Sequence, residues 1–296
     1  MAGVPMDQRD GWIWFDGELK PWKDAKIHVL THGLHYASSV FEGERAYGGE
    51  IFKSREHTER LIRSAKTLDM PMPWSVEQIE EAKRLVLEKN GLVDAYVRPV
   101  AWRGSEELSV PARNNTVHLA IAAWVWPSYF SVEEKLKGIR LEWSKWKRPS
   151  PETIPSSAKA AGLYMICTLS KDAAMANGYA DSMMLDYRGY VAEATGANVF
   201  FIKGKEITTP TPDCFLNGLT RQTLIDLAKR NGYTVTERHI LPEELVNFDE
   251  CFLTGTAAEV TPVSEIGQYK FTPGEGCRTL IDAYSAEVQP KQAAAE

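Results

Sequence analysis

Short apolar runs broken by turns dominate the first part of the chain and predict strands. The stretches 12–19 (WIWFDGEL) and 40–52 (VFEGERAYGGEIF) each read as strands around a turn, and two consecutive glycines in the second are a hairpin signal. The more continuous apolar runs 94–102 (DAYVRPVAW) and 117–126 (VHLAIAAWVW) are typical of buried strands.

Two helices are predicted between these strands. Apolar residues three and four positions apart share one face of a helix over 56–68. Ser75 and Gln78 have the spacing of a capping box at the start of a second helix, and Gly91 is its stop signal.

The apolar pattern lapses from Pro127 to Lys137, which indicates a domain boundary. We therefore expect an N-terminal α/β domain over 1–127, an interdomain loop over 128–137 and a C-terminal domain over 138–296. Strand patterns resume at 138–146, 181–195, 198–210 and 250–256, with helices predicted after Gly162 and inside 216–232.

Composition narrows the class of protein. Of 296 residues, 44% are apolar and 25% are charged, as in ordinary soluble globular proteins. The net charge of -6, with both signs mixed along the chain, leaves no basic stripe, so we expect no nucleic-acid partner. No apolar run approaches the roughly 20 residues that span a bilayer, and no signal-peptide core is visible, so we expect no membrane partner and a cytoplasmic location. Four separated cysteines without a CxxC pair predict reduced packing thiols.

One lysine, Lys159, lies among small residues in the segment 153–167 (TIPSSAKAAGLYMIC). A solvated surface is the common alternative for any lysine. The serines, alanines and glycine around this one leave room for a flat molecule to come close, and a lysine so placed can lose its proton and attack a carbonyl. Lys159 is therefore a candidate nucleophile.

Two turns offer backbone N–H groups to an anion. Asn217 and Gly218 come directly before a predicted helix, whose positive end suits a phosphate. The run 254–258 (TGTAA) follows an apolar strand and adds hydroxyl groups. A helix cap and a simple strand-to-loop turn are the structural alternatives.

Glu193 and Arg60 complete a candidate set. Glu193 lies between alanines in a strand pattern, so a buried carboxylate there would need a cationic partner such as a protonated heterocycle nitrogen. Arg60 lies beside the apolar face of the helix over 56–68 and can reach inward. An exposed strand and a solvated helix are the alternatives. A Schiff-base lysine, two anion turns, an arginine and an acid together fit pyridoxal 5'-phosphate.

Two other classes compete with this interpretation. His28, His32 and His35 have a spacing that could bind a metal on a helix, but Gly33 and the neighbouring residues disfavour a helix there, and we expect no metal. A non-catalytic carrier of pyridoxal phosphate, or an enzyme that has lost its activity, is the second alternative. The completeness of the candidate set argues against it.

The chain resembles a branched-chain amino acid aminotransferase of the fold-type IV pyridoxal-phosphate enzymes, nearly from end to end. The motifs that carry the resemblance are HGLHYASSVFEGERAY, REHTERL, AYVRP, TIPSSAKAAGLY, EATGANVF, LNGLTRQTL and FLTGTAAEVTPV. The resemblance implies a two-domain α+β fold, with a smaller N-terminal α/β domain and a larger C-terminal pseudo-barrel α/β domain that binds pyridoxal 5'-phosphate.

The resemblance also implies the roles of individual residues. Lys159 would form the Schiff base and move the proton, Glu193 would pair with the ring nitrogen, and Tyr164 would bind the phenolic oxygen. The phosphate would be held by Arg60, Leu219, Thr220 and Thr256, and the substrate α-carboxylate by Thr256, Ala257 and Ala258.

The implied reaction is reversible amino transfer between leucine, isoleucine or valine and 2-oxoglutarate. One pocket must then hold an apolar side chain and a distal carboxylate in turn. Phe41, Tyr164, Trp126 and Val110 are expected in the apolar wall, and Tyr36, Arg98 and Tyr129 at the carboxylate. By the resemblance, Tyr36 and Val110 come from a neighbouring subunit, so we expect a homodimer or a higher homo-oligomer.

Two departures from the family pattern lie near the expected substrate mouth. Ala37-Ser38 stands where Gly-Thr is usual, and Ser109 where a glycine is usual, which leaves the fine specificity open. A transaminase selective for (R)-amines or for D-amino acids is the alternative activity. The FEGERAY segment argues against the D-amino acid enzymes.

Overall fold

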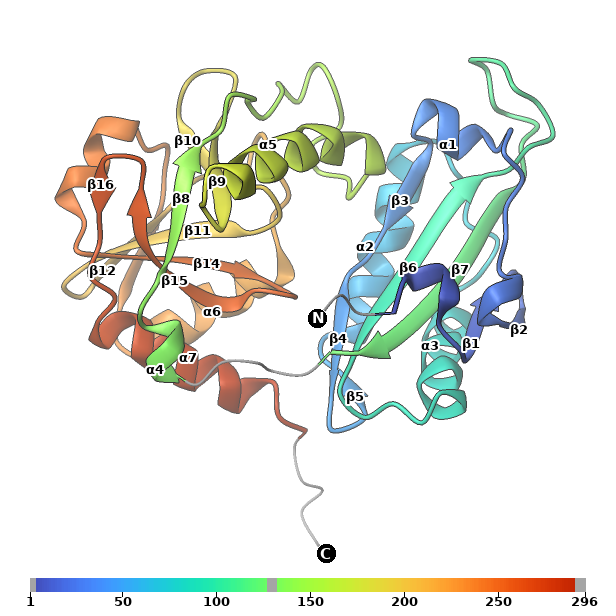
Figure 1. Cartoon of the computed structure of the whole chain (residues 1–296), viewed down its shortest axis with the longest axis horizontal. Helices are drawn as coiled ribbons and strands as arrows, with labels where there is room; N and C mark the ends of the chain where they lie inside the picture. The colour runs from blue at the N-terminus through green and yellow to red at the C-terminus, as the bar shows by residue number, and fades with distance from the viewer. Residues whose placement is uncertain (1–3, 127–131, 291–296) are drawn as a thin grey trace, which may run out of the picture. The chain divides into compact units, whose positions relative to one another are not determined.

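The computed structural model describes residues 4–126 and 132–290, which divide into two compact units. Unit 1 holds residues 4–126 and 158–162 together with Pro290, and unit 2 holds 132–157 and 163–289. The lysine segment 158–162, expected in the second domain, thus belongs to unit 1. Both units combine helices and strands (Figure 1), as expected for the α+β class.

Unit 1 is built on an antiparallel sheet with the order β2-β1-β7-β6-β4-β5, and β3 also pairs with β6. The long strands β6 and β7 pair without a break from Ala95 opposite Val125 to Arg103 opposite Val117. The strands are β1 (Trp12–Phe15), β2 (Glu18–Pro21), β3 (Ser39–Phe41), β4 (Glu44–Tyr47), β5 (Glu50–Ile51), β6 (Ala95–Arg103) and β7 (Val117–Val125).

Two amphipathic helices, α2 (Ser54–Thr67) and α3 (Val76–Lys89), pack together against this sheet (Figure 1). Their apolar stripes are buried, and this burial holds the layers together. The predicted capping box is confirmed, since Ser75 Oγ accepts a hydrogen bond from the Gln78 N–H and the Gln78 side chain accepts one from the Ser75 N–H. Short 3-10 turns at η1 (Met6–Gln8) and η2 (Trp22–Asp24) flank β1 and β2.

Unit 2 contains a closed ring of six strands in the order β10-β9-β8-β15-β14-β11, because β11 pairs back with β10. The parallel strands β12 and β13 extend the sheet beyond β11, and β16 pairs with β15. This closure confirms the expected pseudo-barrel. The strands are β8 (Ile139–Trp143), β9 (Asp181–Leu185), β10 (Val191–Ala194), β11 (Asn198–Lys203), β12 (Glu206–Thr209), β13 (Thr234–Glu237), β14 (Glu250–Gly255), β15 (Glu259–Ile266) and β16 (Tyr269–Lys270).

Apolar side chains from the ring strands, including Leu141, Val199 and Val263, form the core of unit 2. Helices α6 (Leu219–Arg230) and α7 (Glu275–Glu287) pack together and against β14, whereas α5 (Met165–Ala176) packs on β9. The remaining helical elements of unit 2 are α4 (Val132–Lys135) and the 3-10 turn η4 (Pro242–Asn247), and the turn η3 (Ala161–Tyr164) leads into α5.

Several elements differ from the sequence expectation, among them the strands β13 and β15, which were not predicted. A short helix, α1 (His32–Tyr36), forms where we expected none, and Gly33 permits it because a Cβ there would lie 3.0 Å from the Cβ of Trp102. The interdomain loop expected over 128–137 contains α4. Helix α7 was not predicted. The tail 291–296 and residues 127–131 lie outside the described residues.

The four cysteines, Cys167, Cys214, Cys251 and Cys277, are buried and free, as expected for packing thiols. Burial raises the pKa of Cys167 to about 11, so this thiol stays protonated at neutral pH. Among the helices in the described ranges, none combines the length and the apolar composition that a membrane span requires.

Candidate active site

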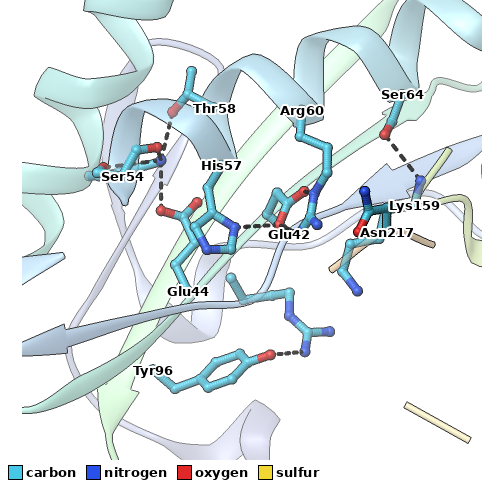
Figure 2. A network of polar contacts seen from close by, with 12 residues as sticks. Glu42, Glu44, Ser54, His57, Thr58, Arg60, Ser64, Tyr96, Lys159 and Asn217 are labelled. Carbon is cyan, nitrogen blue, oxygen red and sulfur yellow. Dashed lines mark hydrogen bonds and ion pairs between the residues drawn. The ribbon is translucent and has the colours of Figure 1, made fainter. Parts of the chain in front are cut away.

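Hydrogen bonds of its backbone N–H and carbonyl hold Lys159 in unit 1. Its N–H donates to Ser64 Oγ on α2 at 3.0 Å (Figure 2). Its carbonyl accepts from the Phe41 N–H at 3.1 Å. The next residue, Ala160, forms a β-bridge with Val40, and both alanines beside the lysine are buried. The small residues therefore let the segment lie against β3, while the half-buried lysine places Nζ 4.8 Å from the centroid of the Phe41 ring.

Arg60 lies one turn before Ser64 on the same face of α2 and is fixed by a buried carboxylate (Figure 2). Its Nε and Nη2 each donate to one oxygen of Glu42 at 2.7 Å, and His57 Nδ1 lies 2.7 Å from Glu42. Burial alone would raise the pKa of Glu42, but Arg60 and His57 hold the pKa of that carboxyl well below its usual range. The bidentate contact sets the plane of the guanidinium.

Arg98 brings a positive charge to the lining of a largely apolar cavity of about 420 Å³ in unit 1. Its Nη2 donates to the Tyr96 hydroxyl at 2.9 Å, and its Cζ lies 4.8 Å from the centroid of the Phe41 ring. Within the described residues its buried Nε has no hydrogen-bond partner. A buried guanidinium N–H in this state favours an anionic ligand.

Tyr36 and Val110 lie on exposed segments of unit 1. Tyr36 ends α1 and is 46% exposed, and Val110 lies in the loop after β6 and is 78% exposed. His32 connects the two segments, because its Nδ1 lies 2.6 Å from Ser38 Oγ and its Nε2 lies 2.9 Å from the carbonyl oxygen of Ser109.

Glu193 is buried in unit 2, on β10, and its carboxylate contacts groups on two other segments. Arg148 Nε lies 3.4 Å from Oε1, and Asn198 Nδ2 donates to Oε2 at 3.0 Å. Arg148 Nη1 also contacts the Leu163 carbonyl, directly before Tyr164 at the start of α5. A buried carboxylate needs a cation beside it, and Arg148 is a cation that the sequence patterns did not reveal.

Two turns of unit 2 present backbone N–H groups. Helix α6 begins at Leu219 with Gly218 as its N-cap and no side-chain cap, so the first N–H groups, including that of Thr220, face outward at the positive end of the helix. Leu219 and Thr220 are themselves buried.

The second turn joins β14 to β15 over residues 256–258, with Thr256 half-buried and Ala257 exposed, while Ala258 is half-buried and its carbonyl accepts from Thr261.

The predicted residues therefore divide between the units. Unit 1 brings Lys159, Arg60, Phe41 and Arg98 around β3 and α2, and unit 2 brings Glu193 and both anion turns to the ends of the ring strands. Trp126 is the last described residue of its segment, and its ring lies 5.3 Å from that of Tyr96. Tyr129 lies outside the described residues.

Sequence reasoning missed Glu42, Arg148 and Asn198. Glu42 lies in a strand pattern, where an acid resembles an exposed face, and Arg148 lies in a Pro-rich loop without a periodic signal. The one local signal was that Glu42 and Asn198 lie inside the motifs that carry the resemblance.

In the described part of the chain, one group of side chains has the spacing of metal ligands, formed by Asp186, Asp213 and Cys214. Arg188 Nη2 already lies 2.6 Å from Asp186 and 2.9 Å from Asp213, so a guanidinium supplies the positive charge there. The histidines near α1 contact backbone and side-chain groups instead: His35 Nε2, for example, lies 2.8 Å from the Val29 carbonyl.

Comparison with known proteins assigns this arrangement to one family. The family model for class IV aminotransferases matches residues 39–266. A probable branched-chain-amino-acid aminotransferase of Rickettsia felis is 45% identical over 92% of this chain and 93% of its own length. The branched-chain aminotransferase of Thermoproteus uzoniensis with norvaline superposes with a TM-score of 0.89, at 35% identity and 95% coverage of both chains. The branched-chain amino acid aminotransferase of Thermobaculum terrenum in its PLP-form gives a TM-score of 0.85, at 30% identity, over 94% of both chains.

Proposed function

The chain belongs to the class IV aminotransferase family, and we propose that it is a branched-chain amino acid aminotransferase, which transfers the amino group reversibly between leucine, isoleucine or valine and 2-oxoglutarate. Relatives and solved structures of that activity cover more than nine-tenths of the chain. The observation that carries the proposal is the lysine segment 158–162, held by α2 and β3 so that the half-buried Lys159 lies between two buried alanines.

The residues present fit pyridoxal 5'-phosphate. Glu193 supplies a buried carboxylate for a protonated ring nitrogen, and the N-terminus of α6, which has no side-chain cap, offers its backbone N–H groups to a phosphate. At the end of β14 the buried Thr254 Oγ1 has no hydrogen-bond partner within the described residues. The donor set thus matches a phosphate, and the acceptor set matches a pyridinium.

When bound, pyridoxal 5'-phosphate supplies an electron sink that makes the substrate α-proton acidic. Lys159 would hold the cofactor through Nζ and then move the α-proton with the same amine. Glu193, whose Oε1 lies 3.4 Å from Arg148 Nε, would pair with the ring nitrogen and favour its protonated form. Tyr164 would bind the phenolic oxygen, and Arg60 would bind the phosphate.

The N–H groups of Leu219 and Thr220, with Thr256, would also hold the phosphate. Thr256, Ala257 and Ala258 receive the substrate α-carboxylate.

Substrate choice follows from Arg98 and the apolar walls near it. Arg98, half-buried and lacking a partner at Nε within the described residues, binds the distal carboxylate of glutamate or 2-oxoglutarate, together with Tyr36 and Tyr129. Phe41, Trp126, Tyr164 and Val110 contact the branched side chain. One methylene in such a pocket changes binding by only about 1–3 kcal/mol, so all three branched substrates react.

The active protein is a cytoplasmic homodimer or a higher homo-oligomer. The exposure of Tyr36 and Val110 supports this, since both are expected in the substrate pocket and both lie on the surface of one chain. Neighbouring apolar side chains are also exposed, at Ile27, Val29, Leu30, Leu34 and Leu108. A partner chain that covers them would carry its Tyr36 and Val110 to the site.

Donor profiling tests the proposal. We expect the purified protein to be yellow, to lose that absorbance with borohydride, and to react with leucine, isoleucine and valine in the presence of 2-oxoglutarate. Lys159→Ala should bind the cofactor weakly and lose turnover, whereas Lys147→Ala, at a lysine outside the site, should keep both. Reaction with a chiral aryl amine or a D-amino acid, without reaction with leucine, would refute the assignment.

A further inference from the structure

Asn198 occupies a junction of three predicted cofactor-binding segments in unit 2. It begins β11, and its register partners are Glu193 on β10 and Thr254 on β14. It is buried, with 5% of its surface exposed. Glu193, the end of β14 and the start of α6 therefore all lie next to the side chain of Asn198.

Both the nitrogen and the oxygen of the Asn198 side-chain amide form hydrogen bonds. Its Nδ2 donates to Glu193 Oε2 at 3.0 Å and to the Leu216 carbonyl at 3.0 Å, while its Oδ1 accepts from the Gly218 N–H at 3.2 Å. The chemistry fixes this orientation, because a flipped amide would set its oxygen against two acceptors. An aspartate would do the same, and an alanine would leave buried groups unpaired.

Gly218 makes the close approach possible. A Cβ at this position would lie 2.4 Å from Asn198 Oδ1, and the next nearest atom outside that carbonyl group would lie at 3.7 Å. The backbone of Gly218 has φ -62° and ψ 142°, which an alanine can also adopt. The side chain of Asn198, not the backbone conformation, therefore requires glycine here.

We propose that Asn198 is a positioning residue that holds the carboxylate of Glu193 and the turn before α6 at a fixed separation. The inference rests on the proposed function, in which Glu193 meets the ring nitrogen and α6 meets the phosphate of one cofactor. These two groups are joined by a rigid ring and a short linker, so the separation of their protein partners decides whether both can bind together.

Asn198→Asp is the direct test, and Asn177→Asp is its matched control, since Asn177 Nδ2 also donates to a glutamate, Glu142, but at the surface. Pyridoxal 5'-phosphate affinity is measured by absorbance titration. Sulfate is the probe of the turn before α6. Its binding to the full chain without cofactor is measured as the rise in melting temperature at constant ionic strength. We expect Asn198→Asp to lose about 10- to 100-fold in cofactor affinity and most of the sulfate shift at pH 8. The control should stay within about twofold of the wild type on the same scale.

A pH profile distinguishes positioning from general damage. In Asn198→Asp two carboxylates face each other, so one gains a proton on going from pH 8 to 5.5 and can again donate to the other. Sulfate keeps its charge over this range. The buried thiol of Cys167, with its pKa raised to about 11, stays neutral. We expect the sulfate shift of the variant to recover in part at pH 5.5, whereas a parallel profile for variant and wild type would overturn the proposal.

A double-mutant cycle tests the contact if the aspartate variant does not fold. Gly218→Ala should weaken sulfate and cofactor binding about tenfold in the wild-type background, and by less than about twofold in the Asn198→Ala background, where the obstructing oxygen is gone. Additive effects would overturn the proposal. A wild-type protein that does not bind pyridoxal 5'-phosphate would contradict the proposed function. The double-mutant cycle measured with sulfate would still test the role of Asn198.

Discussion

Substitution of the buried Glu42 tests whether its carboxylate orients and stabilises the guanidinium of Arg60. Glu42 is fully buried and accepts two charge-assisted hydrogen bonds of 2.7 Å from Arg60, with His57 at 2.7 Å. In Glu42→Gln the amide NH₂ must face one of these donors, and the buried guanidinium loses its counter-charge. Breaking such a pair costs about 3–5 kcal/mol, so the free energy of unfolding should fall by that amount at pH 7.

The pH dependence of this difference follows from the pKa of Glu42, which Arg60 and His57 hold below its ordinary value of 4.5 in spite of burial. The unfolded state therefore takes up a proton first as the pH falls. The stability from Glu42 is fully present above pH 4.5 and is lost as the pH falls toward the folded pKa. Between pH 4.5 and 3 the advantage of the wild type over Glu42→Gln should shrink by about 2 kcal/mol.

Urea unfolding of the cofactor-free chain, followed at a series of pH values, measures both quantities. Glu59→Gln is the matched control on the same helix, because Glu59 pairs with Arg55 and Arg63 at the surface, at 3.4 and 4.0 Å. The control should change the free energy of unfolding by less than about 1 kcal/mol. The reasoning would be refuted if Glu42→Gln cost no more than this control, or if its stability ran parallel to that of the wild type below pH 4.5.

Three further predictions concern unit 1 and the thiols. Ala37 has φ 54° at the exposed end of α1, so Ala37→Gly should raise the free energy of unfolding by about 0.5–1 kcal/mol in urea titrations, and a loss of stability would contradict the strain argument. A Cβ on Gly43 would lie 2.1 Å from the Tyr96 hydroxyl that accepts from Arg98, so Gly43→Ala should raise KM for 2-oxoglutarate more than KM for the branched oxo acids in steady-state assays; equal effects would refute this. A thiol reagent at pH 8 should modify no cysteine in the native protein and four after unfolding, since all four are buried and the pKa of Cys167, for example, is raised to about 11; a reactive native thiol would show that a buried site opens.

Local chemistry explains what could be predicted from the sequence. The small residues beside Lys159 were expected to leave room for a flat molecule, and in the structure Ala158 and Ala160 are instead buried, with Ala160 bridged to Val40 of β3. The Ser75 and Gln78 pattern indicated a helix start, and both hydrogen bonds form. Helix α1 was missed because Gly33 reads as a helix breaker, although its lack of a Cβ is what lets the helix lie against β6.

Long-range pairing explains what the sequence did not reveal. Glu193 needs a cation when buried, and the pattern around it indicates only that need. Arg148, which meets it at 3.4 Å, lies 45 positions earlier in a Pro-rich loop with no periodic signal. The three contacts of Asn198 likewise join β10, β11 and the turn before α6, so they exist only once the ring of strands has closed.

The two departures from the family pattern are connected by His32, and this connection limits what they change. Nε2 faces the carbonyl oxygen of Ser109 at 2.9 Å and must donate, so in the neutral ring Nδ1 accepts from the Ser38 hydroxyl at 2.6 Å. A threonine at 38 would supply the same hydroxyl, and any residue at 109 would supply the same carbonyl. The departures therefore keep the bridge between α1 and the loop that carries Val110. Ser109 adds a hydrogen bond, in which its Oγ donates to the Pro111 carbonyl at 3.0 Å. Ala37 adds backbone strain, because a residue with a Cβ there has a positive φ. Both effects act on the backbone, so preference among leucine, isoleucine and valine should depend on the pocket side chains more than on these positions.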